Sequence, residues 1–526
     1  MIDLWQLLKD DAAVQALNSH TEGLSSLTPG AECLVIATAF RQKPRNIVVV
    51  KNNLYTAQQL YRKLTPLLQE DVLLFSVEES LRVEAYASTP TMYAGQMETL
   101  THLILEDRPR VIVTHPLALV KYLPTAETFR RHILNIKVGQ TIKMNEFREK
   151  LVTSGYKMAA RVDQPLTFSV RGDVVDVFSI QEARPTRIEF FDDEIDSIRY
   201  FDMSTQRTVA KAENALIVPA SIMIYEEDFD AVEKRIRVQL ERDLKRCDFP
   251  DELENNVSRD IEYLRKRYFE HYLYRYRCFF AETGLFLDYV SEPDIILSTA
   301  IEGMQNYENV INETADFIRE IFGAGNGLAY FSVFADYRQL LVGKDHYEIG
   351  LFADYRHPIQ TSIKPFYFSV LPLDKMTDEI LKLAQNYTVI LALPEGSRKM
   401  IADIMYQRGI LAEDVITFMD EIFEEGFECG KVIVMTAREL FGTNIRKGRY
   451  SRKFNEAIQL DDYQDLNPGD YVVHNQYGIG KYQGIVTREM RGFTVIICVY
   501  CIRMMMSCWC LWNSSVWYAS LSATKV

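Results

Sequence analysis

Apolar and polar side chains alternate most regularly between residues 186 and 202. Because successive side chains on a β-strand point to opposite faces of the sheet, this pattern predicts that Ile188 and Phe190 point inward. Arg187, Glu189 and Phe191 would then lie together on the outer face. The segment is therefore predicted to be a strand whose solvent face carries an arginine, an acid and a large aromatic ring.

The acidic pair that follows this strand predicts a hairpin. Asp192-Asp193 suits a two-residue turn, because aspartate tolerates left-handed backbone conformations. The returning strand would place Glu194 opposite Phe191, and Asp196 opposite Glu189. An aromatic ring surrounded by charge is either a stray surface residue or the anchor of a protein interface, and the pattern alone leaves both open.

Residues 1–125 alternate apolar runs with polar segments of helical length, which predicts an α/β unit. The runs that we expect to be strands are Cys33–Thr38, Asn46–Val50, Val72–Val77 and Val111–Thr114. The segments that we expect to be helical are Thr56–Leu68 and Met97–Glu106. Further on, Met144–Ser154 is predicted to be a helix with Asn145 as its cap.

Residues 216–345 are predicted to be mainly helical and charged. A stripe of apolar and aromatic residues at every fourth position predicts one continuous helix that packs on its neighbours. The stripe consists of Leu264, Tyr268, Tyr272 and Tyr276. Its arginines would also suit a nucleic-acid contact, but core packing is the favoured interpretation. Pro293–Leu297 predicts a buried strand, and Gly323–Gly327 predicts a helix end rather than a nucleotide loop.

The remainder of the chain contains a second α/β pattern and the beginning of a β-rich segment. Within residues 346–445, Tyr387–Ala392 and Lys431–Met435 are predicted strands and Arg398–Arg408 a predicted helix. In residues 463–491, Tyr471–His474 predicts a strand, Gly478–Gly480 a tight corner and Lys481–Val486 a second strand.

Composition is ordinary for a globular protein, with 48% hydrophobic and 25% charged residues among 526. That length exceeds one core and predicts three or four folding units. The net charge of −14 opposes nonspecific DNA binding, which requires local positive charge. No secretory signal or membrane span is recognisable, so a cytoplasmic monomer is expected.

The segment 492–526 differs in character from the rest. It contains no Asp or Glu and holds three of the four tryptophans and half of the eight cysteines. We find no helical or strand periodicity in it and interpret it as an aberrant tail, such as a frameshift produces, that promotes aggregation. A metal site at Cys498, Cys501, Cys508 and Cys510 is disfavoured because the spacing of the second pair is poor.

Two long motifs carry a family resemblance. The first comprises Arg171–Phe178, Arg187–Phe191 and Asp193–Asp202, and the second is Leu466–Ile485. The first motif resembles the module that the bacterial transcription-repair coupling factor shares with the B subunit of the excision nuclease. The second is similar to the start of that family's RNA-polymerase-interacting domain. The resemblance is traceable from the N-terminus to about Arg491.

The resemblance implies a multidomain α/β fold built from several parts. These are a degenerate helicase-like α/β domain at 1–125, a docking module of mixed β structure at 126–215 and a mainly helical continuation at 216–345. They are followed by a further α/β domain at 346–445, a basic linker at 446–462, an incomplete small β-barrel at 463–491 and the tail at 492–526. We expect the barrel not to close.

The resemblance also implies partners and contact residues. In that family the docking module recruits the damage-recognising A subunit of the excision nuclease, and the corresponding residues here are Arg171, Arg187 and Phe191. The barrel would bind the RNA polymerase β subunit through a region that includes its first strand, the glycine corner and the start of its second strand, namely Tyr471, Val473, Gly478, Gly480, Lys481 and Tyr482. DNA is a partner of the intact family member.

Five cations crowd into eight residues before the barrel and are either a solvated tether or phosphate contacts. They are Arg446, Lys447, Arg449, Arg452 and Lys453.

Two functions remain open. The resemblance implies that an ATP-driven DNA translocase follows the polymerase-binding domain in the intact family member, but the phosphate-binding pattern G-x-x-x-x-G-K-[ST] does not occur in this chain. No Gly-Lys-Thr follows Leu27–Gly30, where the resemblance would place it. The first hypothesis is therefore a docking adaptor for nucleotide excision repair without catalytic residues, metal or cofactor, since ATP and Mg²⁺ are expected only for a motor domain. The alternative is the ATP-dependent translocase itself.

Overall fold

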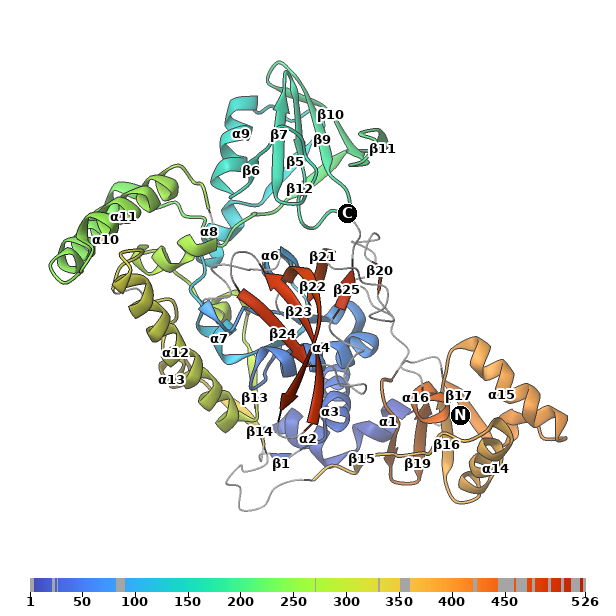
Figure 1. Cartoon of the computed structure of the whole chain (residues 1–526). Helices are drawn as coiled ribbons and strands as arrows, with labels where there is room; N and C mark the ends of the chain where they lie inside the picture. The colour runs from blue at the N-terminus through green and yellow to red at the C-terminus, as the bar shows by residue number, and fades with distance from the viewer. Residues whose placement is uncertain are drawn as a thin grey trace. The chain divides into compact units, whose positions relative to one another are not determined.

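The computed structural model shows a mixed α/β protein with several separate sheets (Figure 1). It describes residues 4–20, 24–25, 27–81, 90–269, 271–329, 332–350, 360–419 and 423–442, and after these only the strands at 458–459, 471–474, 478–490, 493–502, 506–511 and 521–523. The chain divides into two compact units, Met1–Glu79 with Ala94–Arg446 and Ser80–Tyr93 with Lys447–Val526.

A six-stranded parallel sheet forms the first α/β part. Its strand order is β1-β14-β13-β2-β4-β3, and each neighbouring pair runs parallel. The strands are β1 (Leu24–Ser25), β2 (Ile47–Val50), β3 (Val72–Leu74), β4 (Val111–Thr114), β13 (Asp294–Ser298) and β14 (His346–Gly350). Strands β2 and β4 are buried along their whole length, as expected where helices cover both faces of a parallel sheet.

Helices connect these strands. They are α1 (Leu4–Lys9), α2 (Ala12–Ser19), α3 (Pro29–Gln42), α4 (Leu54–Leu68), η1 (Gln69–Asp71), α6 (Pro90–Leu105), α7 (Pro116–Val120), α12 (Ala300–Gly323) and α13 (Tyr337–Leu341). Helix α4 begins at a capping box in which the side chains of Asn53 and Thr56 each accept from the other's backbone N–H. The structure therefore confirms the predicted helices at Thr56–Leu68 and Met97–Glu106.

A five-stranded sheet of order β15-β18-β19-β16-β17 forms the second α/β part. Its strands are β15 (Ile363–Pro365), β16 (Thr388–Ala392), β17 (Ile416–Met419), β18 (Phe427–Cys429) and β19 (Val432–Thr436). Its helices are α14 (Leu373–Ala384), α15 (Glu395–Gln407), η4 (Ala412–Asp414) and α16 (Ala437–Phe441). The two strands and the helix predicted for residues 346–445 are confirmed.

The predicted strand at Cys33–Thr38 is wrong, because this run lies inside helix α3. Thr28 caps the helix by accepting a hydrogen bond from the backbone N–H of Ala31, and Pro29 occupies the first turn. Every residue of α3 from Ala31 to Phe40 is buried. A helix that is apolar on all sides has no helical period to detect, so its sequence resembles a buried strand.

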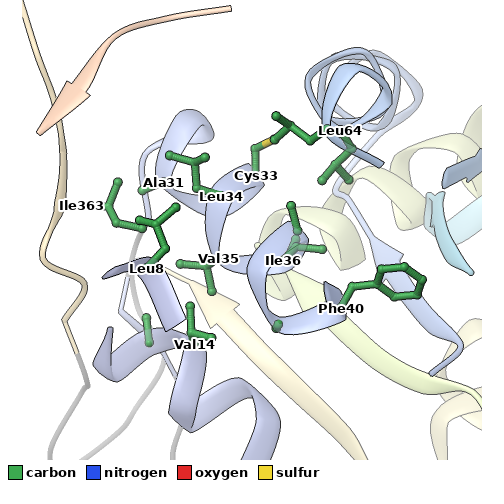
Figure 2. Packing of buried hydrophobic residues seen from close by; sticks show 14 of the residues in the cluster. Leu8, Val14, Ala31, Cys33, Leu34, Val35, Ile36, Phe40, Leu64 and Ile363 are labelled. Carbon is green, nitrogen blue, oxygen red and sulfur yellow. The ribbon is translucent and has the colours of Figure 1, made fainter. Parts of the chain in front are cut away.

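The reason for this burial is the position of α3 between the two sheets. One continuous apolar cluster contains Ile47 and Val49 of β2, Val432 and Val434 of β19, and the buried side chains of α1 to α3. Figure 2 shows Leu34 of α3 on the side of Leu8 and Ile363, and Cys33 on the side of Leu64. Helices α14 and α15 cover the opposite face of the second sheet, where Val389 and Ile433 belong to a separate cluster.

The part predicted above to be a docking module consists of helices α8 (Ala126–Arg131) and α9 (Met144–Thr153) and two groups of strands, which are antiparallel except that β6 and β7 run parallel. Strands β5 (Leu134–Lys137) and β12 (Asn214–Ile217) form a pair, and six others form a sheet of order β11-β10-β9-β8-β7-β6. These six are β6 (Lys157–Met158), β7 (Thr167–Arg171), β8 (Val174–Val177), β9 (Thr186–Phe191), β10 (Glu194–Phe201) and β11 (Thr208–Ala212). Phe147 and Leu151 of α9 pack on the inner face of this sheet.

Helix α9 confirms the prediction of a helix at Met144–Ser154 but corrects its cap. Lys143 is the capping residue and makes no side-chain cap bond, whereas Asn145 is exposed in the first turn.

We expect Asn145→Ala to change the free energy of unfolding of the module by no more than about 0.5 kcal/mol, since alanine is the better helix former. Thr125→Ala, which removes the side-chain cap of α8 at Thr128, is the control and should cost about 1 kcal/mol. Hydrogen exchange of the amides of each helix, measured at increasing urea concentration, gives both changes in the free energy of unfolding. A loss near about 1 kcal/mol for Asn145→Ala would show that Asn145 caps the helix after all.

Residues 216–345 contain helices α10 (Phe229–Leu244), α11 (Pro250–Arg265), η2 (His271–Phe279) and η3 (Phe286–Tyr289). The prediction of one helix through the stripe from Leu264 to Tyr276 is wrong. Helix α11 ends at Arg265, Arg267 takes a left-handed conformation with φ of 58°, and η2 has three residues per turn. The four-residue spacing is therefore lost, and Tyr268 is 49% exposed although Leu264 and Tyr276 are buried. Strand β13 and the end of α12 at Gly323 confirm the other two predictions for this region.

The second unit contains an antiparallel sheet of order β20-β25-β21-β22-β23-β24. Its strands are β20 (Ile458–Gln459), β21 (Tyr471–His474), β22 (Gly478–Met490), β23 (Phe493–Ile502), β24 (Met506–Leu511) and β25 (Leu521–Ala523). Two predictions need correction. The glycines of Gly478–Gly480 lie within β22, paired with β21, rather than at a corner. The tail also contains strands, because the β-branched and aromatic residues of Phe493–Ile502 favour extended structure without strict alternation.

None of the described helices combines the length and the apolar character that crossing a bilayer would require.

Candidate protein-docking surface

Strands β9 and β10 are joined by the two-residue turn that the sequence predicts. Asp192 adopts a left-handed conformation with φ of 57°, and Glu194 pairs with Phe191 across the turn. The predicted pairing of Asp196 with Glu189 is wrong, because a register shift after Ile195 places Ser197 opposite Glu189. A β-bulge inserts one unpaired residue and moves every later partner along by one position.

The inner and outer faces of β9 are those that the alternation predicts. Ile188 and Phe190 are buried in the core of the module, and the Phe190 ring lies 5.8 Å from that of Phe147 on α9. Arg187 and Glu189 are half-buried on the other face, and Phe191 is 78% exposed. The rigid packing beneath the strand therefore holds an exposed phenylalanine ring next to the turn.

Arg187 is already engaged within the module. Its Nε and Nη2 donate to the two carboxylate oxygens of the buried Asp176 at 2.7 and 2.8 Å. Its guanidinium also lies 4.5 Å from the centre of the Phe201 ring. The hydrogen bonds to Asp176 raise the pKa of Arg187. The bidentate geometry that would suit a carboxylate of a partner is thus used by a carboxylate of this chain.

Arg171 differs from Arg187 in being exposed. It is the last residue of β7, and its Nη2 donates to the backbone carbonyl of Ala160 at 2.9 Å. Gly172 follows with φ of +57°, a conformation that glycine adopts without steric cost and that turns the chain into β8. Arg171 is therefore the candidate contact residue whose positive charge is most available to another molecule.

A second ion pair, which the sequence pattern does not predict, lies on this face. Glu189 accepts from Ser197 Oγ at 2.8 Å and from Arg199 Nη2 at 2.7 Å. Alternation places Glu189 on the outer face, but its partners follow from the bulge, which leaves no signal in the sequence. The outer face is thus built from two arginine–carboxylate pairs, with Arg171 and Phe191 beside them.

The candidate polymerase-binding residues lie on β21 and β22. Tyr471 pairs with Lys481, Val473 with Ile479, and Gly480 with Val472. Gly478 pairs with His474, and Tyr482 continues along β22 to pair with Tyr500 of β23. The candidate phosphate contacts of the basic segment, Arg446, Lys447, Arg449, Arg452 and Lys453, lie outside the described residues.

Cysteine and histidine chemistry gives no further site within the described part of the chain. Cys33, Cys247, Cys278 and Cys429 are free thiols, and no group of His, Cys, Asp or Glu with metal-binding geometry occurs among the residues searched. In the second unit, the register of β23 and β24 places Cys498 opposite Cys510 and Tyr500 opposite Cys508.

The N-terminus of α3 follows β1, at the edge of the parallel sheet where α/β folds bind ligands. Lys51 Nζ there donates to both oxygens of the buried Glu32, at 3.0 and 2.7 Å, and to Ser298 Oγ at 2.7 Å. The Glu425 carboxylate lies so near Gly30 that a Cβ on Gly30 would be 2.4 Å from its Oε1. Two carboxylates of the chain thus lie at this helix end, Glu32 paired with Lys51 and Glu425 with Lys63 Nζ at 3.0 Å, so the cations that could hold an anionic ligand already have partners.

Comparisons with known proteins agree with this geometry. Residues 134–223 match the family model described as UvrB interaction domain, and residues 466–501 match the one described as CarD-like/TRCF RID domain. The second match extends ten residues beyond the limit near Arg491 that we set from the motifs, so that limit is corrected.

Curated relatives extend the similarity to nearly the whole chain. The transcription-repair-coupling factor of Staphylococcus aureus (strain bovine RF122 / ET3-1) is 29% identical over 524 residues, which cover 93% of this chain and 44% of the relative. That of Staphylococcus haemolyticus (strain JCSC1435) is 28% identical over 508 residues, which cover 89% of this chain and 42% of the relative. The resemblance to transcription-repair coupling factors is confirmed, and the chain spans less than half the length of these relatives.

Proposed function

We propose that this chain is a docking adaptor that couples transcription to nucleotide excision repair. The module that contains β6 to β11 would bind the damage-recognising A subunit of the excision nuclease, and the sheet that contains β21 and β22 would bind the β subunit of RNA polymerase. The observation that carries the proposal is that Phe191 and Arg171, both exposed, end two strands at the same end of one sheet, within residues that match an interaction-domain family.

The chemistry of this surface supports a protein partner. A large aromatic ring that lies exposed among charged groups is typical of an interface anchor, because it gains apolar burial on binding while the charges fix orientation. Both strands that carry Arg171 and Phe191 are pinned from below by the module core, so little conformational entropy is lost when a partner binds. We infer from the same arrangement that the partner offers an apolar pocket next to a carboxylate.

The finer fold is part of the proposal. We infer that the first α/β part is a helicase-type fold without a phosphate loop, and that the last sheet is the beginning of a small polymerase-binding barrel. The parallel order of the first sheet and the carboxylates around the N-terminus of α3 support the first inference. We further propose that these described residues hold no ATP, which equilibrium binding of a labelled nucleotide to the full chain tests.

Isothermal titration calorimetry of the full chain with the purified A subunit tests the docking role. We expect a saturable complex, and we expect Arg171→Ala to weaken it by about 1 kcal/mol, because an exposed arginine at an interface contributes modestly. Lys157→Ala, on the neighbouring strand β6 and opposite Thr167 at the other end of β7, is the matched control and should leave the affinity unchanged. A chain that is folded but does not bind the A subunit would overturn the docking role.

A further inference from the structure

Two connections join the docking module to the rest of this unit, one from the first α/β part and one to helix α10, and both reach the same buried arginine. The incoming connection follows α7 and passes Leu123, and the outgoing connection follows β12 and passes Ile224. The side chain of Arg277, in η2, is 1% exposed. Its Nη1 donates to the backbone carbonyl of Ile224 at 3.0 Å, and its Nη2 donates to those of Leu123 at 3.2 Å and Glu282 at 2.7 Å.

These three hydrogen bonds go to backbone carbonyls rather than to an acid. Burial lowers the pKa of Arg277 to about 10, so the guanidinium stays protonated at neutral pH. A buried cation requires compensation, and here the compensation comes from the carbonyl dipoles of three chain segments. The guanidinium can satisfy them only while the two connections lie side by side. Its charge therefore favours one arrangement of the connections over others.

Neighbouring groups of η2 and η3 hold the incoming connection in the same way. Tyr289 donates its hydroxyl to the carbonyl of Pro124 at 2.7 Å, and Tyr274 donates to that of Tyr122 at 3.0 Å. Leu123 and Gly284 exchange a pair of backbone hydrogen bonds of 2.9 and 2.8 Å. A Cβ on Gly284 would lie 3.1 Å from the Pro124 carbonyl oxygen, so this close approach depends on glycine.

The outgoing connection is held from the other side. Arg267 Nη1 donates to the carbonyl of Tyr225 at 2.6 Å, and its guanidinium lies 3.4 Å from the centre of the Tyr225 ring. The Tyr225 ring in turn packs 4.9 Å from that of Phe280. Both connections are thus fixed at several successive carbonyls by one stretch of chain that belongs to neither the module nor the parallel sheet.

We propose that η2 and η3 form a clamp that fixes the orientation of the docking module, with Arg277 as its central positioning residue. Two connecting segments without further contacts would let the module change its orientation relative to the rest of the unit, because segments with few buried contacts are mobile. The clamp instead presents the outer face with Phe191 in one direction relative to the parallel sheet. The functional meaning of this orientation rests on the proposed docking role, whereas the clamp itself can be tested without any partner.

Hydrogen exchange on the full chain tests the clamp by comparing Arg277→Met with Arg275→Met. Arg275 is the matched control because its side chain, also in η2, is 11% exposed and pairs with the buried Asp260 of α11 rather than with a connection. Its loss leaves Asp260 to the hydroxyls of Tyr272 and Tyr276, so this variant shows what a loss of stability in η2 alone does to the connections. We expect the amides of Leu123 and Gly284 to exchange at least tenfold faster in Arg277→Met than in Arg275→Met. The module amides of Val175 and Ile188 should keep the same rate in both variants.

Two results would overturn the clamp. One is equal exchange at Leu123 and Gly284 in the two variants, and the other is equally accelerated exchange throughout the module, which would make Arg277 a general stabiliser. If Arg277→Met does not fold, Tyr289→Phe removes one hydroxyl from the clamp and should accelerate Leu123 and Gly284 alone, about threefold. Its failure to do so would also overturn the clamp.

A binding measurement separates the clamp from the docking role. Affinity of the free A subunit for Arg277→Met should stay within twofold of the parent chain, because the outer face with Arg171 and Phe191 is unchanged. A parent chain that does not bind refutes the docking role and leaves the exchange result standing. A parent chain that binds, together with an Arg277→Met variant that exchanges like Arg275→Met, refutes the clamp alone.

Discussion

Replacing Arg187 with alanine is expected to lower the free energy of unfolding of the docking module by about 2 to 4 kcal/mol. The substitution removes both hydrogen bonds to Asp176 and leaves its buried carboxylate without a compensating charge. It also removes the guanidinium from the face of the Phe201 ring. Hydrogen exchange of the amides of Val175 and Ile188 under urea measures the change within this module, which a global melting curve of a multidomain chain would not resolve.

Two controls define this effect. Arg199→Ala breaks the more exposed pair with Glu189 and should cost less than about 1 kcal/mol. Adding Asp176→Ala to Arg187→Ala should recover part of the stability, because no unpaired carboxylate then remains buried. Equal costs for Arg187→Ala and Arg199→Ala, with no recovery in the double variant, would contradict the structural role. The sequence suggests a partner contact for Arg187, so any loss of A-subunit affinity in this variant must be corrected for the unfolded fraction.

Replacing Phe191 with alanine is expected to weaken A-subunit binding by about 2 to 3 kcal/mol, which is roughly a 30- to 150-fold loss of affinity. The ring is 78% exposed in the free chain, so its removal leaves no cavity and should change stability by no more than about 0.5 kcal/mol. Calorimetric titration measures the affinity, and hydrogen exchange of the module verifies the fold.

Tyr406→Ala is the control for this prediction. Tyr406 is another strongly exposed aromatic residue, 72% exposed on α15 of the second α/β part. Its removal should leave A-subunit binding unchanged. Unchanged affinity of Phe191→Ala would show that the ring is a stray surface residue, and equal losses for both variants would point to a nonspecific apolar association.

The hairpin illustrates how much the sequence can predict about the candidate site. Alternation identified the buried Ile188 and Phe190 and the exposed Phe191, and the Asp192-Asp193 turn set the first pair of the register correctly. The bulge after Ile195 was not predictable, because it depends on how β10 meets its neighbours on both sides. The pairing of Arg187 with Asp176 was missed for the same reason, since it joins two strands whose alignment no local pattern specifies.

The errors in the fold have a comparable origin. Cys33–Thr38 was assigned to a strand because a helix buried on every side carries no period, although Thr28 and Pro29 were a readable start signal. The stripe from Leu264 to Tyr276 has helical spacing, yet the left-handed Arg267 interrupts it. Periodicity predicts elements that have one apolar face, and it fails where two layers cover an element or where a single residue ends it.

The position of α3 between two sheets has a consequence for biosynthesis. Helices α1 to α3 leave the ribosome well before Val432 and Val434, which cover them and are made about 390 residues later. At about 5 to 20 residues per second, the nascent chain carries these apolar helices for roughly 20 to 80 s before their outer layer exists. During that interval they are a natural substrate for a chaperone, and a ribosome pause before residue 432 would prolong the exposure.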